Sequence, residues 1–154
     1  MSELPPCGLY RTTRAIGSDV PAGRLVFFHN HGEPGPGVYL PASWKLNRAV
    51  WSERGVTVPD AEWAASLEPL PREGFYRVRE PFHCCTQECR LFGANLLVQL
   101  GYNGEARPIL FVPEWTEAGL AIPTSGTVTD LDRLARLDRL EVAESGAKAG
   151  AEPQ

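Results

Sequence analysis

Three of the chain's four cysteines lie close together in the segment PFHCCTQECRLF, which spans Pro81 to Phe92. Cys84, Cys85 and Cys89 stand in this segment, and His83 directly precedes the first of them. Thiolate sulfur and imidazole nitrogen are the ligands of structural zinc sites, and closely spaced thiols also carry out redox chemistry. The segment therefore raises three chemical possibilities: metal binding, thiol exchange and disulfide formation.

The spacing of these residues limits the metal hypothesis. Cys84-x4-Cys89 and Cys85-x3-Cys89 both differ from the usual Cys-x2-Cys turn, and a complete site needs ligands from elsewhere. On an extended strand His83 and Cys85 share one face, whereas Cys84 points to the other. The metal hypothesis therefore groups Cys85 and Cys89 with Cys7 and His83, and its cofactor is zinc. The alternative is that the chain has no cofactor.

Three other interpretations of the segment compete with metal binding. A redox role needs a basic neighbour such as Arg90 to lower a thiol pKa, and a Cys85–Cys89 bridge needs Cα atoms within about 7 Å. A structural disulfide, including one from the N-terminal cysteine, is the second alternative. The third is a set of buried, inert thiols, because Phe82 and Phe92 flank the cluster and free cysteine packs as a small hydrophobe. We interpret the segment as a cysteine-rich turn before a central hairpin.

A second group of metal-ligating residues is His29-Asn30-His31. Two histidines at positions i and i+2 of a strand point to the same side, where they are able to hold one metal ion. The alternative is that both are surface polar residues that close a strand. In the metal interpretation, His83 is a candidate third histidine.

Two family resemblances begin at these histidines. Gly23, five residues and then His29-x-His31 resembles the opening of the first cupin motif, which implies a small β-barrel with a metal held by that pair, a glutamate and a distant histidine such as His83. The same stretch is similar to the His-x-His strand of JAB-type metalloproteases, with Tyr39 where their serine belongs. Both resemblances cover about ten residues and imply metal chemistry at His29 and His31.

The elements that position these residues are predicted to be mostly β-strands. Proline and glycine recur at short intervals, which favours short strands. We expect a compact small barrel or a two-sheet sandwich of roughly six to eight strands with one or two short helices. The clearest segments are strands at 9–16, 24–31, 38–40, 75–79, 96–102 and 109–112, and a short helix at 61–67 begun by Asp60.

Two local features remain specific predictions. Asn103-Gly104 predicts a type I′ turn that joins strands 96–102 and 109–112. Leucines recur every three residues in 129–140, which predicts a short helix or a short helix followed by a terminal strand through 140–142. We expect residues 1–142 to form a single β-rich domain and residues 143–154 to form a disordered tail.

Composition limits the possible partners. The chain has 154 residues, 43% apolar residues and a net charge of −4, which is typical of one soluble domain. Because the net charge is negative, we expect neither nucleic acid nor an anionic membrane as a partner. The N-terminus lacks the apolar run of a secretory signal. We therefore expect a cytoplasmic protein.

The absence of a complete catalytic motif directs the functional hypothesis. The tryptophans Trp44, Trp51 and Trp63 and the proline-rich loops favour a non-enzymatic module that binds another protein or copies of itself. A metal-binding protein or enzyme that uses His29, His31 and His83 or the Cys84–Cys89 cluster is the alternative. A thiol-redox protein is the third hypothesis.

Overall fold

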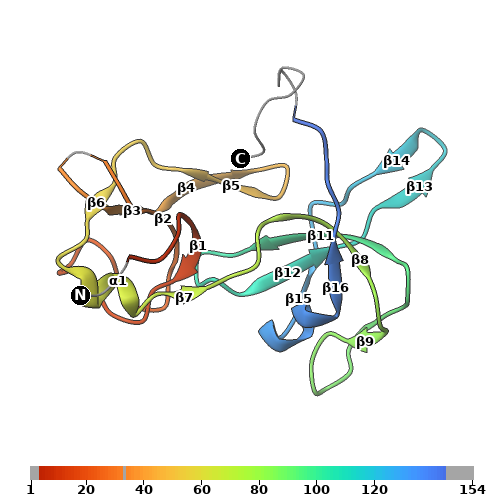
Figure 1. Cartoon of the computed structure of the whole chain (residues 1–154). Coiled ribbons are helices and arrows are strands. Elements are labelled where there is room, and N and C mark those ends of the chain that lie inside the picture. The colour runs from red at the N-terminus through yellow and green to blue at the C-terminus, as the bar shows by residue number, and fades with distance from the viewer. Residues whose placement is uncertain (1–3, 33, 145–154) are drawn as a thin grey trace.

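The computed structural model describes residues 4–32 and 34–144, and it is mostly β (Figure 1). In these residues sixteen short strands form five antiparallel sheets, and there are two short helices. The predicted fold class is thereby confirmed in its sandwich-like form, and the described strands close no barrel. The strands are shorter and more numerous than the sequence suggested.

Two five-stranded sheets lie side by side in Figure 1. The first has the strand order β6 (Val56–Thr57), β3 (Gly37–Tyr39), β2 (Leu25–His29), β1 (Gly8–Arg11) and β7 (Glu68–Pro69). The second has the strand order β15 (Thr127–Val128), β12 (Pro108–Phe111), β11 (Leu97–Tyr102), β8 (Gly74–Val78) and β16 (Leu137–Arg139).

Three two-stranded ribbons extend from these sheets. They are β4 (Pro41–Lys45) with β5 (Arg48–Trp51), β9 (Phe82–His83) with β10 (Leu91–Phe92), and β13 (Glu114–Thr116) with β14 (Gly119–Ala121). The ribbon of β4 and β5 runs across the upper left of Figure 1, and the ribbon of β13 and β14 projects at its upper right. The helices are α1 (Ala61–Ala65) and the 3-10 helix η1 (Leu131–Arg136).

Strands β1 and β2 bury both of their faces. Leu9 and Leu25 belong to a hydrophobic cluster shared with the second sheet, whereas Tyr10, Val26 and Phe28 belong to a cluster beneath α1. Successive side chains of a strand point to opposite faces, so each of these strands contributes to both clusters. Burying such a side chain contributes roughly 1.5–3 kcal/mol. Strands β1 and β2 therefore link the core shared with the second sheet to the core beneath α1.

Helix α1 begins as the sequence predicts. Asp60 is its N-cap, and the Asp60 carboxylate accepts a hydrogen bond of 2.8 Å from the backbone amide of Trp63. The Trp63 ring is buried and donates its indole N–H to the carbonyl of Arg14 at 3.1 Å. At the other end of the chain, η1 followed by β16 matches the predicted short helix and terminal strand, although β16 lies before residue 140.

The predicted turn at Asn103-Gly104 is wrong, although the pairing of its two strands is confirmed. Five residues separate β11 from β12, and the positive φ falls on Ala106 at 62°. The Asn103 side chain accepts hydrogen bonds from the amides of Glu105 and Arg107, at 3.0 and 2.9 Å, so it closes a wider loop around itself. The Gly104 carbonyl accepts from the Leu25 amide at 2.9 Å, which ties this loop to the first sheet.

A two-residue turn with positive φ at both positions occurs instead between β4 and β5. Leu46 and Asn47 have φ values of 52° and 68°, as a type I′ turn requires. The Asn47 amide group donates to the side-chain oxygen of buried Gln99 at 3.0 Å, and Gln99 donates to the Leu46 carbonyl at 3.0 Å. These bonds attach the turn to strand β11. The sequence did not indicate this ribbon.

The remaining predictions concern the chain ends and the membrane. Neither helix in the described part of the chain has the length and apolar character needed to cross a membrane. The tail predicted for 143–154 lies, from residue 145 onward, outside the described residues.

Replacement of Gly101 tests the contact between the β4–β5 turn and β11. A Cβ at Gly101 would lie 2.6 Å from the backbone oxygen of Asn47, so Gly101→Ala must displace the turn. We expect a loss of about 1–3 kcal/mol in the free energy of unfolding, measured by denaturant titration. Gly93→Ala is the matched control, because nothing lies within 4 Å of its Cβ position. Equal stability of the two variants would contradict the contact.

Candidate functional site

The strand before the cysteines is short and ends before the first of them. Strand β9 ends at His83, and its pairing with β10 consists only of His83 with Leu91 and Phe82 with Phe92. The chain turns immediately afterwards, so Cys84 is not on a strand. The opposite facing of Cys84 and Cys85 expected on an extended strand therefore does not apply, because strand pairing stops one residue before Cys84.

The turn brings three sulfur atoms together. The Cys84 and Cys85 sulfurs are 3.6 Å apart, and the Cys85 and Cys89 sulfurs are 3.9 Å apart. All three lie within 4.8 Å of one another, and all four cysteines of the chain are free thiols. Glu88 has a φ of 54°, which helps the loop bring Cys89 back towards Cys85. We call this set, Cys84, Cys85 and Cys89, the thiol cluster.

The backbone of the thiol cluster is attached to the second sheet. Cys84 is 1% exposed, and its carbonyl accepts from the Thr129 hydroxyl at 2.8 Å and from the Asp130 amide at 2.9 Å. The Cys84 amide donates to the Arg90 carbonyl at 2.9 Å, which closes the base of the loop. These bonds hold Cys84 in place from both sides. Cys85 and Cys89 are more exposed, so the cluster opens towards solvent on their side.

The thiols of the cluster differ in acidity. Hydrogen bonds from the Cys89 backbone amide, the Cys84 side chain and the Gln87 amide lower the pKa of Cys85. The hydrogen bond to Cys85 and the charge of its thiolate raise the pKa of Cys89. Cys85 is therefore the first of this pair to ionise as the pH rises. A thiolate is the form of cysteine that binds metal and attacks disulfides.

A cavity of about 390 Å³ lies beside the thiol cluster, and Cys85 is part of its wall. His83 also lines this cavity, and its Nδ1 lies 3.2 Å from a carboxylate oxygen of Glu88. Arg133 and Arg136 complete the polar wall, and they donate to the carbonyls of His83 and Pro81 at 3.0 and 3.3 Å. The cavity gives solvent a path to Cys85.

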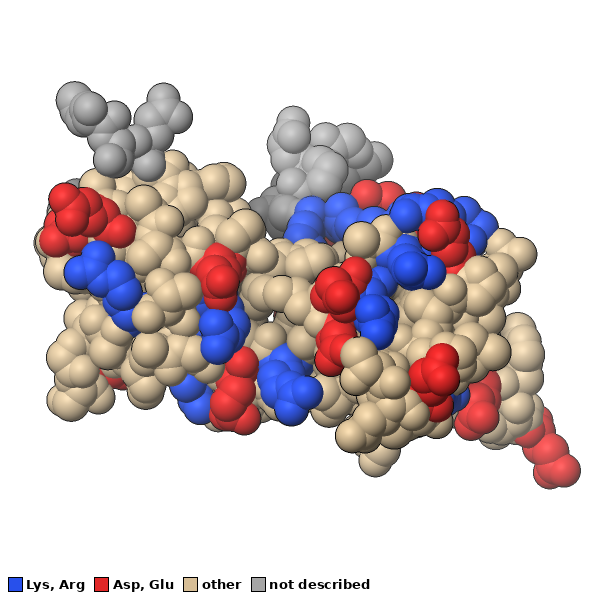
Figure 2. Space-filling view, turned by 90° about the horizontal axis from the view of Figure 1, so that it is seen from below, with Lys and Arg blue, Asp and Glu red and all other residues tan. Residues whose placement is uncertain are grey.

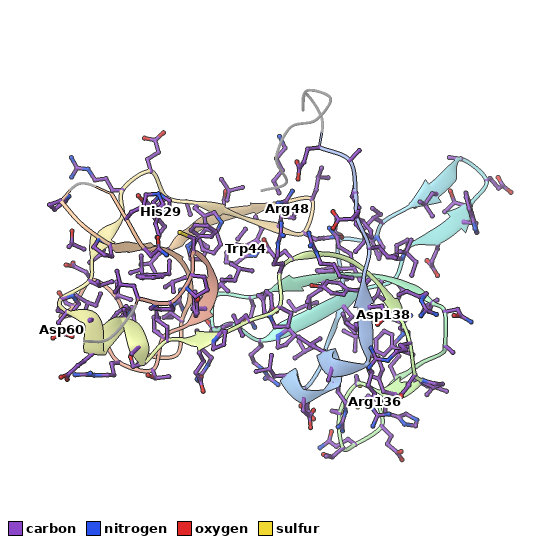
Figure 3. The ribbon with its side chains drawn as sticks, viewed as in Figure 1. His29, Trp44, Arg48, Asp60, Arg136 and Asp138 are labelled. Atoms are coloured by element: carbon purple, nitrogen blue, oxygen red, sulfur yellow. The ribbon has the colours of Figure 1, made fainter. Side chains whose placement is uncertain are left out.

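The second cluster lies on the first sheet. Cys7, His29 and His31 have ligand atoms that all lie within 4.8 Å of one another. In Figure 3 His29 lies at the end of β2, whereas Arg136, which lines the cavity beside the thiol cluster, lies in the other half of the molecule. The two clusters are therefore separate sites. We call Cys7, His29 and His31 the mixed cluster.

The structure groups the predicted ligands differently from the sequence analysis. Cys7 lies with His29 and His31 and apart from Cys85 and Cys89. His83, on β9, belongs to neither cluster and faces Glu88. It is also far from β2, so the described residues do not place it with His29 and His31 (Figure 1).

Three residues of the sites were missed by the sequence analysis. Asn30 contacts both Cys7 and His31, Thr129 holds the Cys84 carbonyl, and Glu88 adopts the positive φ of the thiol loop. Of these three residues, only Asn30 could have been found from the sequence, because it stands between two candidate metal ligands. The contact of Thr129 joins segments 45 residues apart, which no local pattern reveals.

Charges on the face shown in Figure 2 are mixed, with basic and acidic side chains next to each other. Arg77 and Arg79 share the carboxylate of Asp138, with N–O distances of 2.7 Å in both pairs. Hydrogen bonds from Arg79 and then Arg77 lower the pKa of Asp138. At this cluster one carboxylate thus partners two guanidinium groups.

Comparison of the chain with known protein families, with curated proteins and with solved structures finds no match in any of the three. The fold is β-rich, and the described residues include two groups, one of three cysteines and one of a cysteine with two histidines, whose ligand atoms lie close enough to hold a metal ion.

Proposed function

We propose that this chain is a non-enzymatic zinc-binding protein whose ion is held by the thiolates of Cys84, Cys85 and Cys89. The distances between their sulfurs carry the proposal. Tetrahedral zinc with Zn–S bonds of about 2.3 Å requires sulfurs about 3.8 Å apart. Two of the three sulfur–sulfur distances in the thiol cluster, 3.6 and 3.9 Å, lie on either side of that value, and the third is within 4.8 Å. The loop thus has nearly the ligand spacing of a bound site.

The groups around the sulfurs support a metal site. Backbone amides of Cys89 and Gln87 donate hydrogen bonds to the Cys85 sulfur, and such bonds stabilise a thiolate. Hydrogen bonds to its carbonyl and from its amide already hold Cys84 in place. Metal binding therefore has to fix only the more exposed residues Cys85 and Cys89. Outer hydrogen bonds that fix metal ligands commonly raise affinity by about 10–100-fold.

The fourth zinc ligand is expected to come from solvent. Three thiolates leave one tetrahedral position unfilled, and the cavity beside β9 gives water access to Cys85. Several polar side chains of that cavity already have partners: His83 lies against Glu88, Arg133 against Asp130 and Asp132, and Arg136 donates to the Pro81 carbonyl. All three ligands lie in the loop between β9 and β10, so the ion closes this loop, which the Cys84 carbonyl already ties to Thr129 and Asp130. A reducing cytoplasm would keep the thiols available for it.

Removal of one thiol tests the zinc site. Cys89→Ser is expected to lose about one equivalent of zinc relative to the wild-type chain, because two thiolates and water bind zinc far more weakly than three thiolates. The measurement is elemental analysis of protein purified in zinc and gel-filtered into metal-free buffer. Cobalt substitution gives a second readout. A site with three thiolates should show stronger near-ultraviolet thiolate-to-cobalt absorption than a site with one, so the wild-type chain should absorb more strongly than Cys89→Ser.

Cys7→Ser is the matched control, because Cys7 is an exposed cysteine outside the thiol cluster. It should keep the strong thiolate-to-cobalt absorption that Cys89→Ser loses, because its three clustered thiols are intact. The proposal would be overturned if Cys89→Ser and the wild-type chain hold equal zinc, or if the wild-type chain holds none.

Self-association is a second candidate function, and the ribbon of β13 and β14 favours it. Trp115 is 83% exposed and pairs across the ribbon with Leu120, which is 53% exposed. The ribbon pairs with no other described strand, so both of its edges are unpaired, and such edges pair with other strands. The same ribbon on a second copy of the chain is the proposed partner, in a two-fold symmetric contact.

Replacement of Trp115 tests this contact. We expect light scattering coupled to gel filtration to show a dimer of the wild-type chain that shifts to monomer in Trp115→Ala, because the largest apolar side chain of the contact is lost. Leu46→Ala is the control, since Leu46 is 81% exposed but lies on the ribbon of β4 and β5. A monomeric wild-type chain, or equal effects of both variants, would exclude the contact.

A further inference from the structure

The mixed cluster arises from strand pairing on the first sheet. Gly8 on β1 pairs with Phe28 on β2, so the same register continued by one residue places Cys7 opposite His29. His31 follows two residues after His29, and Gly32 then has a φ of 136°, a conformation that side chains rarely adopt. The glycine allows the chain to turn away directly after His31.

The distances in the mixed cluster match those between ligands of one metal ion. The Cys7 sulfur lies 3.4 Å from Nδ1 of His29. A tetrahedral zinc ion with one sulfur and one nitrogen ligand holds those atoms about 3.5 Å apart. The rings of His29 and His31 have centroids 4.0 Å apart, and a ring nitrogen of each lies within 4.8 Å of the other and of the Cys7 sulfur. The three ligands thus need little movement to share an ion.

Asn30 forms hydrogen bonds with two of the three residues of the mixed cluster. Its side-chain oxygen accepts hydrogen bonds from the Cys7 thiol at 3.3 Å and from Nδ1 of His31 at 2.9 Å, and its backbone amide donates to the Cys7 sulfur at 3.4 Å. A histidine that donates from Nδ1 presents a lone pair on Nε2, the usual arrangement for a metal ligand.

The N-terminal segment that carries Cys7 is itself held in place. The Tyr10 hydroxyl donates to the Pro6 carbonyl at 2.6 Å, and the Asn30 amide group donates to the Pro5 carbonyl at 3.2 Å. Tyr10 is buried beneath α1, so its hydroxyl is a fixed anchor. Two consecutive prolines also restrict the backbone before Cys7. The position of the sulfur is therefore set by the fold.

We propose that Cys7, His29 and His31 form a second metal site, which binds a borderline divalent cation such as Zn²⁺ through one thiolate and two imidazoles. Its residues and its sheet are separate from those of the thiol cluster. Cys7 and His31 are exposed, so the fourth coordination position faces solvent and accepts water or a small anion. A site with one thiolate and two neutral imidazoles should exchange its metal faster than the thiol cluster with its three thiolates.

Cobalt titration of the full chain tests the second site. The wild-type chain is expected to bind about two equivalents of Co²⁺, and Cys7→Ser, His29→Ala and His31→Ala should each bind one tightly. Loss of a direct ligand should weaken the affected site by at least about 100-fold, because loss of an outer hydrogen bond alone costs about 10–100-fold. His83→Ala is the control, since this histidine faces Glu88 outside both clusters.

Two variants separate this proposal from the zinc site of the thiol cluster. The double variant with Cys85→Ser and Cys89→Ser should retain one cobalt ion with weak thiolate-to-cobalt absorption. The triple variant that also carries His29→Ala should lose that ion. Circular dichroism and the unfolding midpoint check that each variant is folded. The second site would be overturned if the double variant binds no metal, or if His83→Ala weakens binding as much as His29→Ala does. Both results are independent of whether the thiol cluster binds zinc.

Discussion

The burial of both faces of β1 and β2 is the constraint on which the structure depends. Leu9 and Leu25 pack with the second sheet, while Tyr10, Val26 and Phe28 pack beneath α1. A slip of one residue in their register would exchange these two sets of side chains. The register is therefore strongly fixed, and it is the same register that sets Cys7 opposite His29.

Both clusters lie where strand pairing ends. The thiol cluster follows the last residue of β9, and the mixed cluster stands at the end of β2 and just before β1. At such positions the neighbouring strand fixes one ligand, while the turn is free to bring further ligands alongside it. Contacts from distant segments then complete each site: Thr129 holds Cys84, and Tyr10 holds the segment of Cys7 through the Pro6 carbonyl. In both clusters, ligands fixed by strand pairing thus stand beside ligands placed by a turn.

Local patterns predicted the class of fold and many of its strands, because alternation, proline and glycine act over a few residues. The start of α1 at Asp60 was predictable for the same reason. The turn after β11 was not, since Asn103 uses its own side chain to close a five-residue loop whose Gly104 contacts Leu25. The ribbon of β4 and β5 was missed because Gln99, far along the chain, holds its turn. The individual ligands were recognisable by residue type, but their grouping depended on strand register and on the early end of β9.

The most direct test of the central claim, that the thiol cluster holds zinc, is X-ray absorption at the zinc edge of the Cys7→Ser variant loaded with one equivalent of metal. The account predicts a shell of about three sulfur atoms at about 2.3 Å and one lighter atom at about 2.0 Å. A shell made mainly of nitrogen and oxygen at about 2.0–2.2 Å would contradict it.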